Sequence, residues 1–153
     1  MATIAIGADD AATEMKNIVK SHLQAKGIDV KDFSHDVVDN DQIYPDIAFH
    51  LATAISEGKF ERGILLCGTG IGMAIVANKV PGVRAAQCHD VYSAERARKS
   101  NNAQIMTMGA RVIGPELAKS LVDAWLESEF ESGRSGPKVE RISYYEHQAH
   151  QGS

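Results

Sequence analysis

The feature that most constrains this chain is a glycine-rich turn between a predicted buried strand and a predicted helix. The apolar run 63–66 precedes the turn, Cys67–Gly72 forms it, and residues 73–79 can continue as a helix. Its alternating glycines allow a backbone with positive φ that exposes its N–H groups. Because the following helix N-terminus adds partial positive charge, such a turn can hold an oxyanion or a phosphate. Cys67 and Thr69 place a thiol and a hydroxyl on this turn, which we interpret as the candidate catalytic centre.

Predicted strands and helices alternate along most of the chain. Apolar runs predict five strands, and apolar residues repeating every three to four positions predict helices between and after them. The strands are expected at 3–7, 28–33, 63–66, 83–87 and 104–108, and the helices at 13–26, 44–57, 73–79, 92–100 and 115–127. This alternation predicts one three-layer α/β/α domain, residues 1–153, around a five-stranded, mainly parallel sheet.

Polar and small residues follow the predicted strands. In parallel sheets, ligands bind outside the carboxyl ends of the strands, so residues just after different strands are expected to converge on one edge. The residues in these positions are Asp9, Asp10, Cys67, Thr69, His89 and Gly109.

The C-terminal segment 133–153 differs from the rest. Residues 133–138 are predicted to be a flexible basic segment, and residues 139–150 a final helix with a thin apolar stripe. A terminal helix with so little to bury suggests contact with a partner subunit in a dimer, with docking on its own domain as the alternative.

Composition excludes several classes of protein. A net charge of −4 over 153 residues gives no footprint for nucleic acid or an anionic membrane. No apolar run approaches the roughly 20 residues that span a bilayer. Two cysteines without a C-x-x-C pair argue against a disulfide scaffold, and the histidines show no metal-ligand spacing. We therefore expect a soluble cytoplasmic protein without a metal.

The residues of the turn leave its chemistry open. Cys67 can act as a nucleophile, for which His89 is a candidate partner, or as a proton-transfer base, and partial positive charge favours the thiolate in both cases. The alternative is that Cys67 is a small buried hydrophobic residue. A P-loop does not fit, because Lys79 comes too late, and the turn is a poor dinucleotide fingerprint.

Several segments resemble ribose-5-phosphate isomerase type B and the wider family that includes galactose-6-phosphate isomerase. The resemblance runs from Ile4 to about Ile142 and rests on residues 67–72, 77–84, 88–90, 92–94 and 109–114. It implies a Rossmann-like α/β/α subunit and a homodimer with active sites between subunits, the tetramer being left open. It also implies no metal or other cofactor, and interconversion of an aldose phosphate and a ketose phosphate through an enediolate.

The resemblance implies roles for individual residues. Cys67 matches the general base that moves a proton between C1 and C2. The loop that stabilises the enediolate oxygens is matched by Gly68, Thr69, Gly70, Ile71 and Gly72, which agrees with the N–H donors expected of such a turn. Other substrate-side positions are matched by Asp9, Tyr44 and Asn101, and phosphate-binding arginines by Arg111 and Arg134.

Three histidines that the family places around its substrate are absent. Asp10 stands where a histidine follows the first aspartate, and Ser100 stands where a ring-opening histidine precedes the asparagines. Ser135 follows Arg134 in place of the third histidine, and Lys138 replaces a later arginine. Whether Ser100, His89 or water takes over the ring-opening role stays open.

Loss of the ring-opening histidine, with the base and loop kept, suggests a changed substrate. A four-carbon sugar phosphorylated on O4 cannot close a five-membered ring and needs no ring-opening acid, so erythrulose 4-phosphate and erythrose 4-phosphate fit. Asp10 would repel a phosphate and is expected to face a hydroxyl. The alternatives are a decayed paralogue, a non-catalytic sugar-phosphate binder, one subunit of a galactose-6-phosphate isomerase-like hetero-oligomer, and a thiol-dependent hydrolase.

Overall fold

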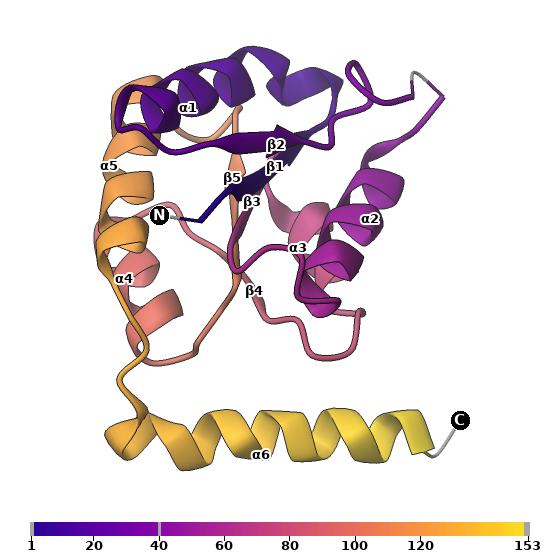
Figure 1. The fold of residues 1–153 in the computed structure, drawn as a ribbon, viewed down its shortest axis with the longest axis vertical. Coiled ribbons are helices and arrows are strands. Elements are labelled where there is room, and N and C mark those ends of the chain that lie inside the picture. The colour runs from indigo at the N-terminus through magenta and orange to yellow at the C-terminus, as the bar shows by residue number, and fades with distance from the viewer. Residues whose placement is uncertain (1, 40, 152–153) are drawn as a thin grey trace.

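A five-stranded parallel sheet lies between two layers of helices in the computed structural model, which describes residues 2–39 and 41–151 (Figure 1). The strands are β1 (Ile4–Ala8), β2 (Val30–Asp32), β3 (Gly63–Cys67), β4 (Ala85–Gln87) and β5 (Ile105–Gly109). The helices are the short 3₁₀ helix η1 (Asp10–Ala12), α1 (Thr13–Ala25), α2 (Tyr44–Ser56), α3 (Ile71–Ala77), α4 (Val91–Lys99), α5 (Pro115–Glu127) and α6 (Ser132–Gln151). The predicted α/β/α class with a five-stranded sheet is confirmed.

The central strands β1, β3 and β5 are buried along their whole length, because helices cover both faces of the sheet. Successive side chains of a strand point to opposite faces. Ile6 and Leu66 pack on one face with α1, α4 and α5, whereas Leu65 and Cys67 pack on the other with α2 and α3. Figure 1 shows these two helical layers on either side of the strands.

The order of the strands, β2-β1-β3-β5-β4, creates a topological switch point between β1 and β3, whose carboxyl edge is the expected ligand crevice. After β1 the chain passes to α1 on one face, and after β3 it passes to α3 on the other. Ligands of such sheets bind where neighbouring connections diverge in this way. Ala8 pairs with Leu66 in the register of β1 and β3, so the residues that follow these strands lie next to each other.

The two edge strands are shorter than predicted. Strands expected at 28–33 and 83–87 are reduced to β2 and β4, each of which pairs on one side only. Ile28 and Val83, which lie outside these ladders, are nevertheless buried in the core. A residue that is buried next to a strand is as apolar as one that pairs within it. The sequence pattern therefore places the ends of these two strands too far out.

The prediction of a flexible segment at 133–138 is wrong, because these residues belong to α6. Gly133 departs from helical dihedral angles, and Pro137 follows four residues later. Proline has no N–H, so Pro137 cannot donate to the carbonyl of Gly133, four residues earlier. The missing hydrogen bond therefore falls where the helix is already irregular. Residues 152–153 of the expected tail lie outside the described part of the chain.

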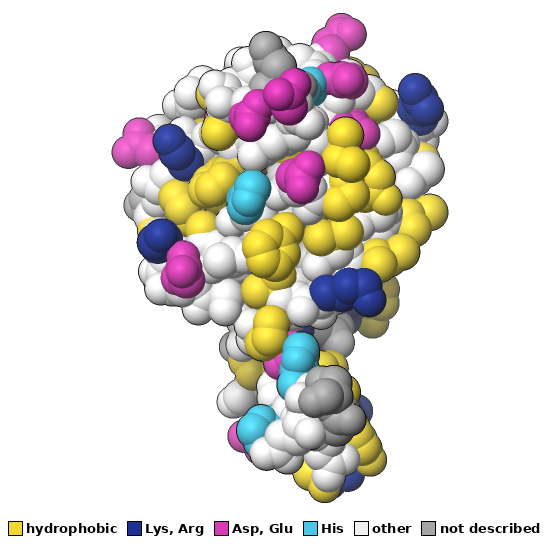
Figure 2. Space-filling model, turned by 90° about the vertical axis from the view of Figure 1, so that its right-hand side faces the viewer, with side chains coloured by type: hydrophobic (Ala, Val, Ile, Leu, Met, Phe, Trp, Pro, Cys, Tyr) yellow, Lys and Arg dark blue, Asp and Glu magenta, His cyan; other side chains and the backbone are white. Residues whose placement is uncertain are grey.

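Helix α6 packs little on the rest of the described chain. Its one buried residue within the described chain is Val139, while Ile142 and Tyr145 of the predicted stripe are exposed. A hydrogen bond to the body joins the N–H of Gly82 to Glu146 Oε2 at 3.0 Å. Figures 1 and 2 show the helix standing clear of the sheet and its layers. Within the described residues, no helix combines the length and the apolar character that a bilayer span requires.

The buried guanidinium of Arg62 ties the end of α5 to the start of β3. Its Nη1 donates to the carbonyls of Trp125 and Leu126 at 2.9 and 3.1 Å, and its Nη2 donates to the carbonyl of Ser128 at 2.9 Å. It also lies over the Trp125 ring, 5.3 Å from the centroid. The last carbonyls of a helix lack helical partners, so this arginine adds a second donor to Trp125, which also accepts the Ser128 N–H at 3.3 Å, and satisfies the carbonyls of Leu126 and Ser128.

Replacing Arg62 by Ala is therefore expected to lower the free energy of unfolding by about 2–4 kcal/mol, because the carbonyls of Leu126 and Ser128 lose their donor and that of Trp125 loses one of two. Urea unfolding followed by circular dichroism measures this. Lys59→Ala removes a cation from an exposed pair with Glu57 and is the control, with an expected loss below about 0.5 kcal/mol. If Arg62→Ala and Lys59→Ala had the same midpoint of urea unfolding, the proposed stabilising role of Arg62 would be contradicted.

Candidate active site

The glycine turn is shorter than its sequence predicts and is packed tightly against β5. Strand β3 continues through Cys67, and α3 begins at Ile71. Gly70 starts the helix with φ +80°, and a Cβ built on it would lie 2.9 Å from the backbone of Met108. The Thr107 hydroxyl donates to the carbonyl of Gly70 at 2.7 Å. Only glycine fits this position, since both the dihedral angle and the close approach exclude a side chain.

Cys67 ends β3 with its sulfur against this turn. The N–H of Gly70 donates to Cys67 Sγ at 3.1 Å. Cys67 is 6% exposed, so it is a nearly buried thiol at the end of a strand rather than a surface thiol. The bond from Gly70 gives the buried sulfur a polar contact with the backbone of the turn. Cys67 also packs with the apolar residues of α2 and α3, so its thiol is held between the core and the glycine turn.

Cys88 contrasts with Cys67. Burial, followed by the nearby charge of Asp90, raises the pKa of Cys88 to about 12. Its thiol is therefore protonated at neutral pH and cannot act as the base. Of the two free cysteines, only Cys67 receives a backbone N–H bond within the described residues.

Thr69 and Arg111 complete the turn. Thr69 Oγ1 accepts from the N–H of Ile71 at 3.2 Å, and the Thr69 carbonyl accepts from Gln87 Nε2 at 2.7 Å. The N–H of Arg111 donates to the carbonyl of Gly68 at 3.0 Å, and the Arg111 side chain passes over Gly68, 3.5 Å from where a Cβ would be. The structure therefore brings a guanidinium to the turn that was predicted to bind an anion.

Tyr44 reaches the same turn from the first position of α2. A Cβ on Gly72 would lie 2.4 Å from the Tyr44 ring and hydroxyl, so the ring rests directly on Gly72. The third glycine of the motif is thus needed for a tertiary contact rather than for its dihedral angle. The contact brings a phenol hydroxyl to the turn, and the implied role of Tyr44 in lining a sugar pocket stays a prediction.

Asp9 and Asp10 follow β1 on the other side of the crevice. Asp9 caps η1 by accepting the N–H of Ala11 at 3.1 Å. Burial and the adjacent charge of Asp10 raise the pKa of Asp9, although the Ala11 bond and the charges of Arg111 and His35 oppose the rise. The charge of Arg111 therefore acts on Asp9 at the carboxyl edge of the sheet.

His35 is a residue of this site that sequence reasoning missed. It follows β2 and contacts Asp10 through its Nε2. The sequence around it is acidic and aperiodic, and gives no sign that this histidine reaches the strand-end residues. The order of β2 and β1 in the sheet provides that information.

His89 also lies at this edge, but its role there is to hold backbone. Its Nε2 accepts the N–H of Gly109 at 2.9 Å, so the proton of the neutral ring is on Nδ1. Gly109 pairs with Cys67 in the ladder between β3 and β5. The hydrogen bond to the sulfur of Cys67 comes from Gly70 rather than from His89 in the described chain.

Four predicted site residues do not reach the glycine turn within this chain. Ser100 and Asn101 cap the end of α4, which runs from the carboxyl end of β4 back to the amino end of β5. They therefore lie at the edge of the sheet opposite Cys67. Arg134 and Lys138 are on α6, which stands clear of the body. No group of three or more His, Cys, Asp or Glu in the described part of the chain could hold a metal ion.

Comparison with known proteins identifies relatives along the whole chain. A profile of the Ribose/Galactose Isomerase family matches residues 4–142. A D-erythrulose-4-phosphate isomerase of Pectobacterium atrosepticum is 66% identical over 148 residues, covering 97% of each chain. A Ribose-5-P isomerase B of Listeria innocua is 55% identical over 138 residues, covering 90% of this chain and 92% of the relative.

A solved structure agrees with these matches. Ribose-5-phosphate isomerase B of Clostridium thermocellum is similar with a TM-score of 0.90 and 40% identity, over 96% of this chain and 99% of that chain. The matched residues include the whole sheet and the glycine turn. This chain therefore belongs to the Ribose/Galactose Isomerase family.

Proposed function

We propose that this protein is an aldose–ketose isomerase of a four-carbon sugar 4-phosphate, with Cys67 as the proton-transfer base. The observation that carries the proposal is the bond from the Gly70 N–H to Cys67 Sγ at 3.1 Å, which holds the sulfur against the glycine turn at the carboxyl edge of the sheet. Both cysteines are free thiols, as expected in a reducing compartment such as the cytoplasm.

The proposed reaction moves one proton between two carbons. From the ketose, the Cys67 thiolate takes a proton from C1, the C1–C2 double bond forms, and the carbonyl oxygen becomes an oxyanion. The hydroxyl proton on O1 passes to O2, and the Cys67 thiol returns its proton to C2, giving the aldose. N–H groups of a rigid turn stabilise the oxyanion without reorganising, which is the largest single contribution in many enzymes.

The choice of a four-carbon substrate rests on the residues that replace histidines. Ser100 and Asp10 stand at positions where the resemblance implies histidine, so ring opening has lost its expected acid. A tetrose phosphorylated on O4 does not need that acid. The relative from Pectobacterium atrosepticum, 66% identical, is named a D-erythrulose-4-phosphate isomerase, which supports the same substrate class.

We further propose that the active site forms between two copies of this chain. Ser100 and Asn101 lie opposite Cys67 within one subunit, so they can meet it only from a second copy. Helix α6 carries Arg134 and leaves Ile142 and Tyr145 exposed. Exposed hydrophobic side chains also gather over α2 and α3, on the face that Figure 2 presents. Apolar surfaces of this kind mark protein contacts.

Replacing Cys67 by Ala is expected to lower kcat by about 10²–10⁴-fold or more, because the proton-transfer base is lost. A coupled assay of erythrulose 4-phosphate isomerisation measures it. Cys88→Ala, the matched control, removes the thiol that burial keeps protonated and should stay within a few-fold of wild type. Near-normal kcat in Cys67→Ala would refute the assignment of the base.

A panel of sugar phosphates tests the substrate. We expect kcat/KM for the tetrose 4-phosphates to exceed that for ribose 5-phosphate by at least about tenfold, since the closed ring of the pentose finds no acid to open it. Galactose 6-phosphate extends the panel to six carbons. Equal turnover of the four- and five-carbon substrates would contradict the proposal.

Mixed subunits test the shared site. Cys67→Ala and Arg134→Ala subunits, each impaired alone, are refolded together. One site of every mixed dimer then has both wild-type residues, so random pairing should restore about a quarter of wild-type activity. No recovery of activity, in a sample where native mass spectrometry detects the mixed dimer, would show instead that each site is built within one chain.

A further inference from the structure

We propose that His35 is a positioning residue for the site. Its contact with Asp10 fixes the turn formed by Asp9 and Asp10, and this turn binds the hydroxyl groups of the substrate. The inference rests on the proposed function, because it assigns part of the substrate contact to that site. It adds a residue that lies outside the motif segments and on a different strand connection from them.

The segment that carries His35 is anchored on both sides of it. The Ser34 hydroxyl, which is buried, accepts the N–H of Ala8 at 2.9 Å, and the Ser34 N–H donates to Asp32 at 2.9 Å. After His35, Asp36 accepts from Lys16 Nζ at 3.1 Å. The residue before His35 is thus bonded to the end of β1, and the residue after it is bonded to α1.

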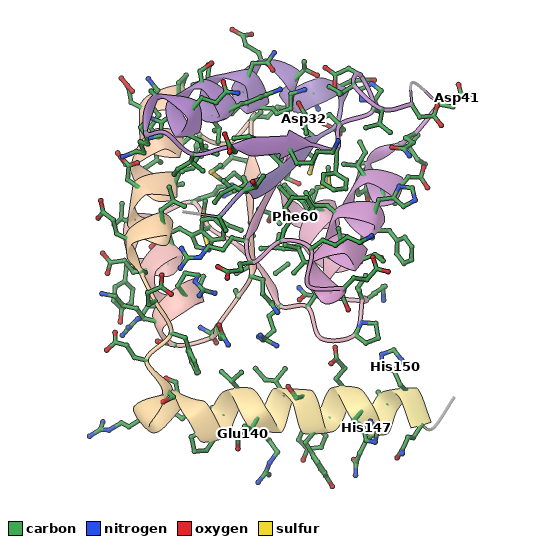
Figure 3. All side chains as sticks on the ribbon, in the orientation of Figure 1. Asp32, Asp41, Phe60, Glu140, His147 and His150 are labelled. Carbon is green, nitrogen blue, oxygen red and sulfur yellow. The ribbon has the colours of Figure 1, made fainter. Side chains whose placement is uncertain are left out.

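Lys16 places a buried charge beside this anchored segment, and burying a charge is unfavourable unless it is paired. Its residue is 1% exposed, and its ammonium lies 3.2 Å from Asp32 and 3.1 Å from Asp36. Figure 3 labels Asp32 beside β2. Burial would raise the pKa of Asp32, but the bonds from Ser34 and Lys16 outweigh it, so the pKa lies below its ordinary value. A buried lysine is retained only when paired, and here its two partners flank His35.

The anchored imidazole meets Asp10. His35 Nε2 contacts Asp10 Oδ1, and an ionised carboxylate only accepts, so this nitrogen carries the proton. His35 Nδ1 is buried with no hydrogen-bond partner among the described residues. The Asp10 side chain is 88% exposed, so its remaining lone pairs are accessible to a ligand. The contact with Asp10 is therefore the polar contact that the His35 ring makes among the described residues.

The held turn is the one that contains Asp9. Asp10 opens η1, and Asp9 caps it. Two adjacent carboxylates repel a phosphate but accept hydrogen bonds from sugar hydroxyls. Arg111 provides positive charge beside Asp9 and the glycine turn. The carboxyl edge of the sheet thus carries a cationic side at Arg111 and an acceptor side at Asp9 and Asp10, and His35 contacts the acceptor side.

A double-mutant cycle between His35 and Asp10 tests the inference. His35→Leu removes the donor and is expected to lower kcat/KM on the tetrose 4-phosphate about tenfold, mainly through KM. His35→Gln, whose amide nitrogen can take the place of Nε2, should restore most of the loss. In the Asp10→Asn background, His35→Leu should have little further effect, since its action passes through Asp10.

Controls separate positioning from folding and from the proposed function. His22→Leu breaks a second His–Asp pair, with Asp123 at 2.7 Å, and should leave kcat/KM unchanged. The inference fails if His35→Leu and His22→Leu behave alike, or if the effects of His35→Leu and Asp10→Asn add. Loss of activity in Cys67→Ala together with normal kinetics in His35→Leu would overturn this inference alone, whereas an active Cys67→Ala would overturn the proposed function.

Discussion

The bond from the Gly70 N–H to the sulfur of Cys67 is the interaction on which the proposed chemistry depends. It exists because Gly70 adopts a left-handed dihedral angle directly against the backbone of Met108. Thr107 holds the Gly70 carbonyl from the neighbouring strand. A shift of β5 relative to β3 would move the turn and the sulfur contact together. The rigidity of the central sheet is therefore part of the proposed catalytic apparatus, since fixed dipoles stabilise charge best when they do not reorganise.

The local parts of this arrangement can be predicted from the sequence. An apolar strand, a glycine turn and a helix are encoded by neighbouring residues, so the pattern of residues alone predicts both the class of fold and the candidate centre. The contact of Tyr44 with Gly72 cannot be predicted in this way, because it joins α2 to α3 across 28 positions. The resemblance implies a site role for Tyr44, but the reason for glycine at position 72 emerges only from the packing.

The features that the sequence does not predict depend on contacts between residues that are far apart in the chain. His35 lies in an aperiodic acidic segment, and its importance follows from Lys16 and Ser34, which act on its neighbours through tertiary contacts. Ser100 and Asn101 belong to the expected site by resemblance, yet the direction of α4 carries them to the opposite edge. The segment 133–138 contains residues typical of a loop but continues as a helix. In each case the deciding partner is distant in sequence, or belongs to a second copy in the proposed assembly.

Exchange of hydrogen with solvent tests the central claim most directly. In D₂O, a thiolate base that holds the transferred proton is expected to exchange it, so deuterium should appear at C1 of the ketose and C2 of the aldose. Nuclear magnetic resonance of erythrulose 4-phosphate with wild type and Cys67→Ser can follow this. We predict enzyme-dependent labelling with wild type and none above background with Cys67→Ser; equal labelling by both proteins would contradict Cys67 as the group that moves the proton.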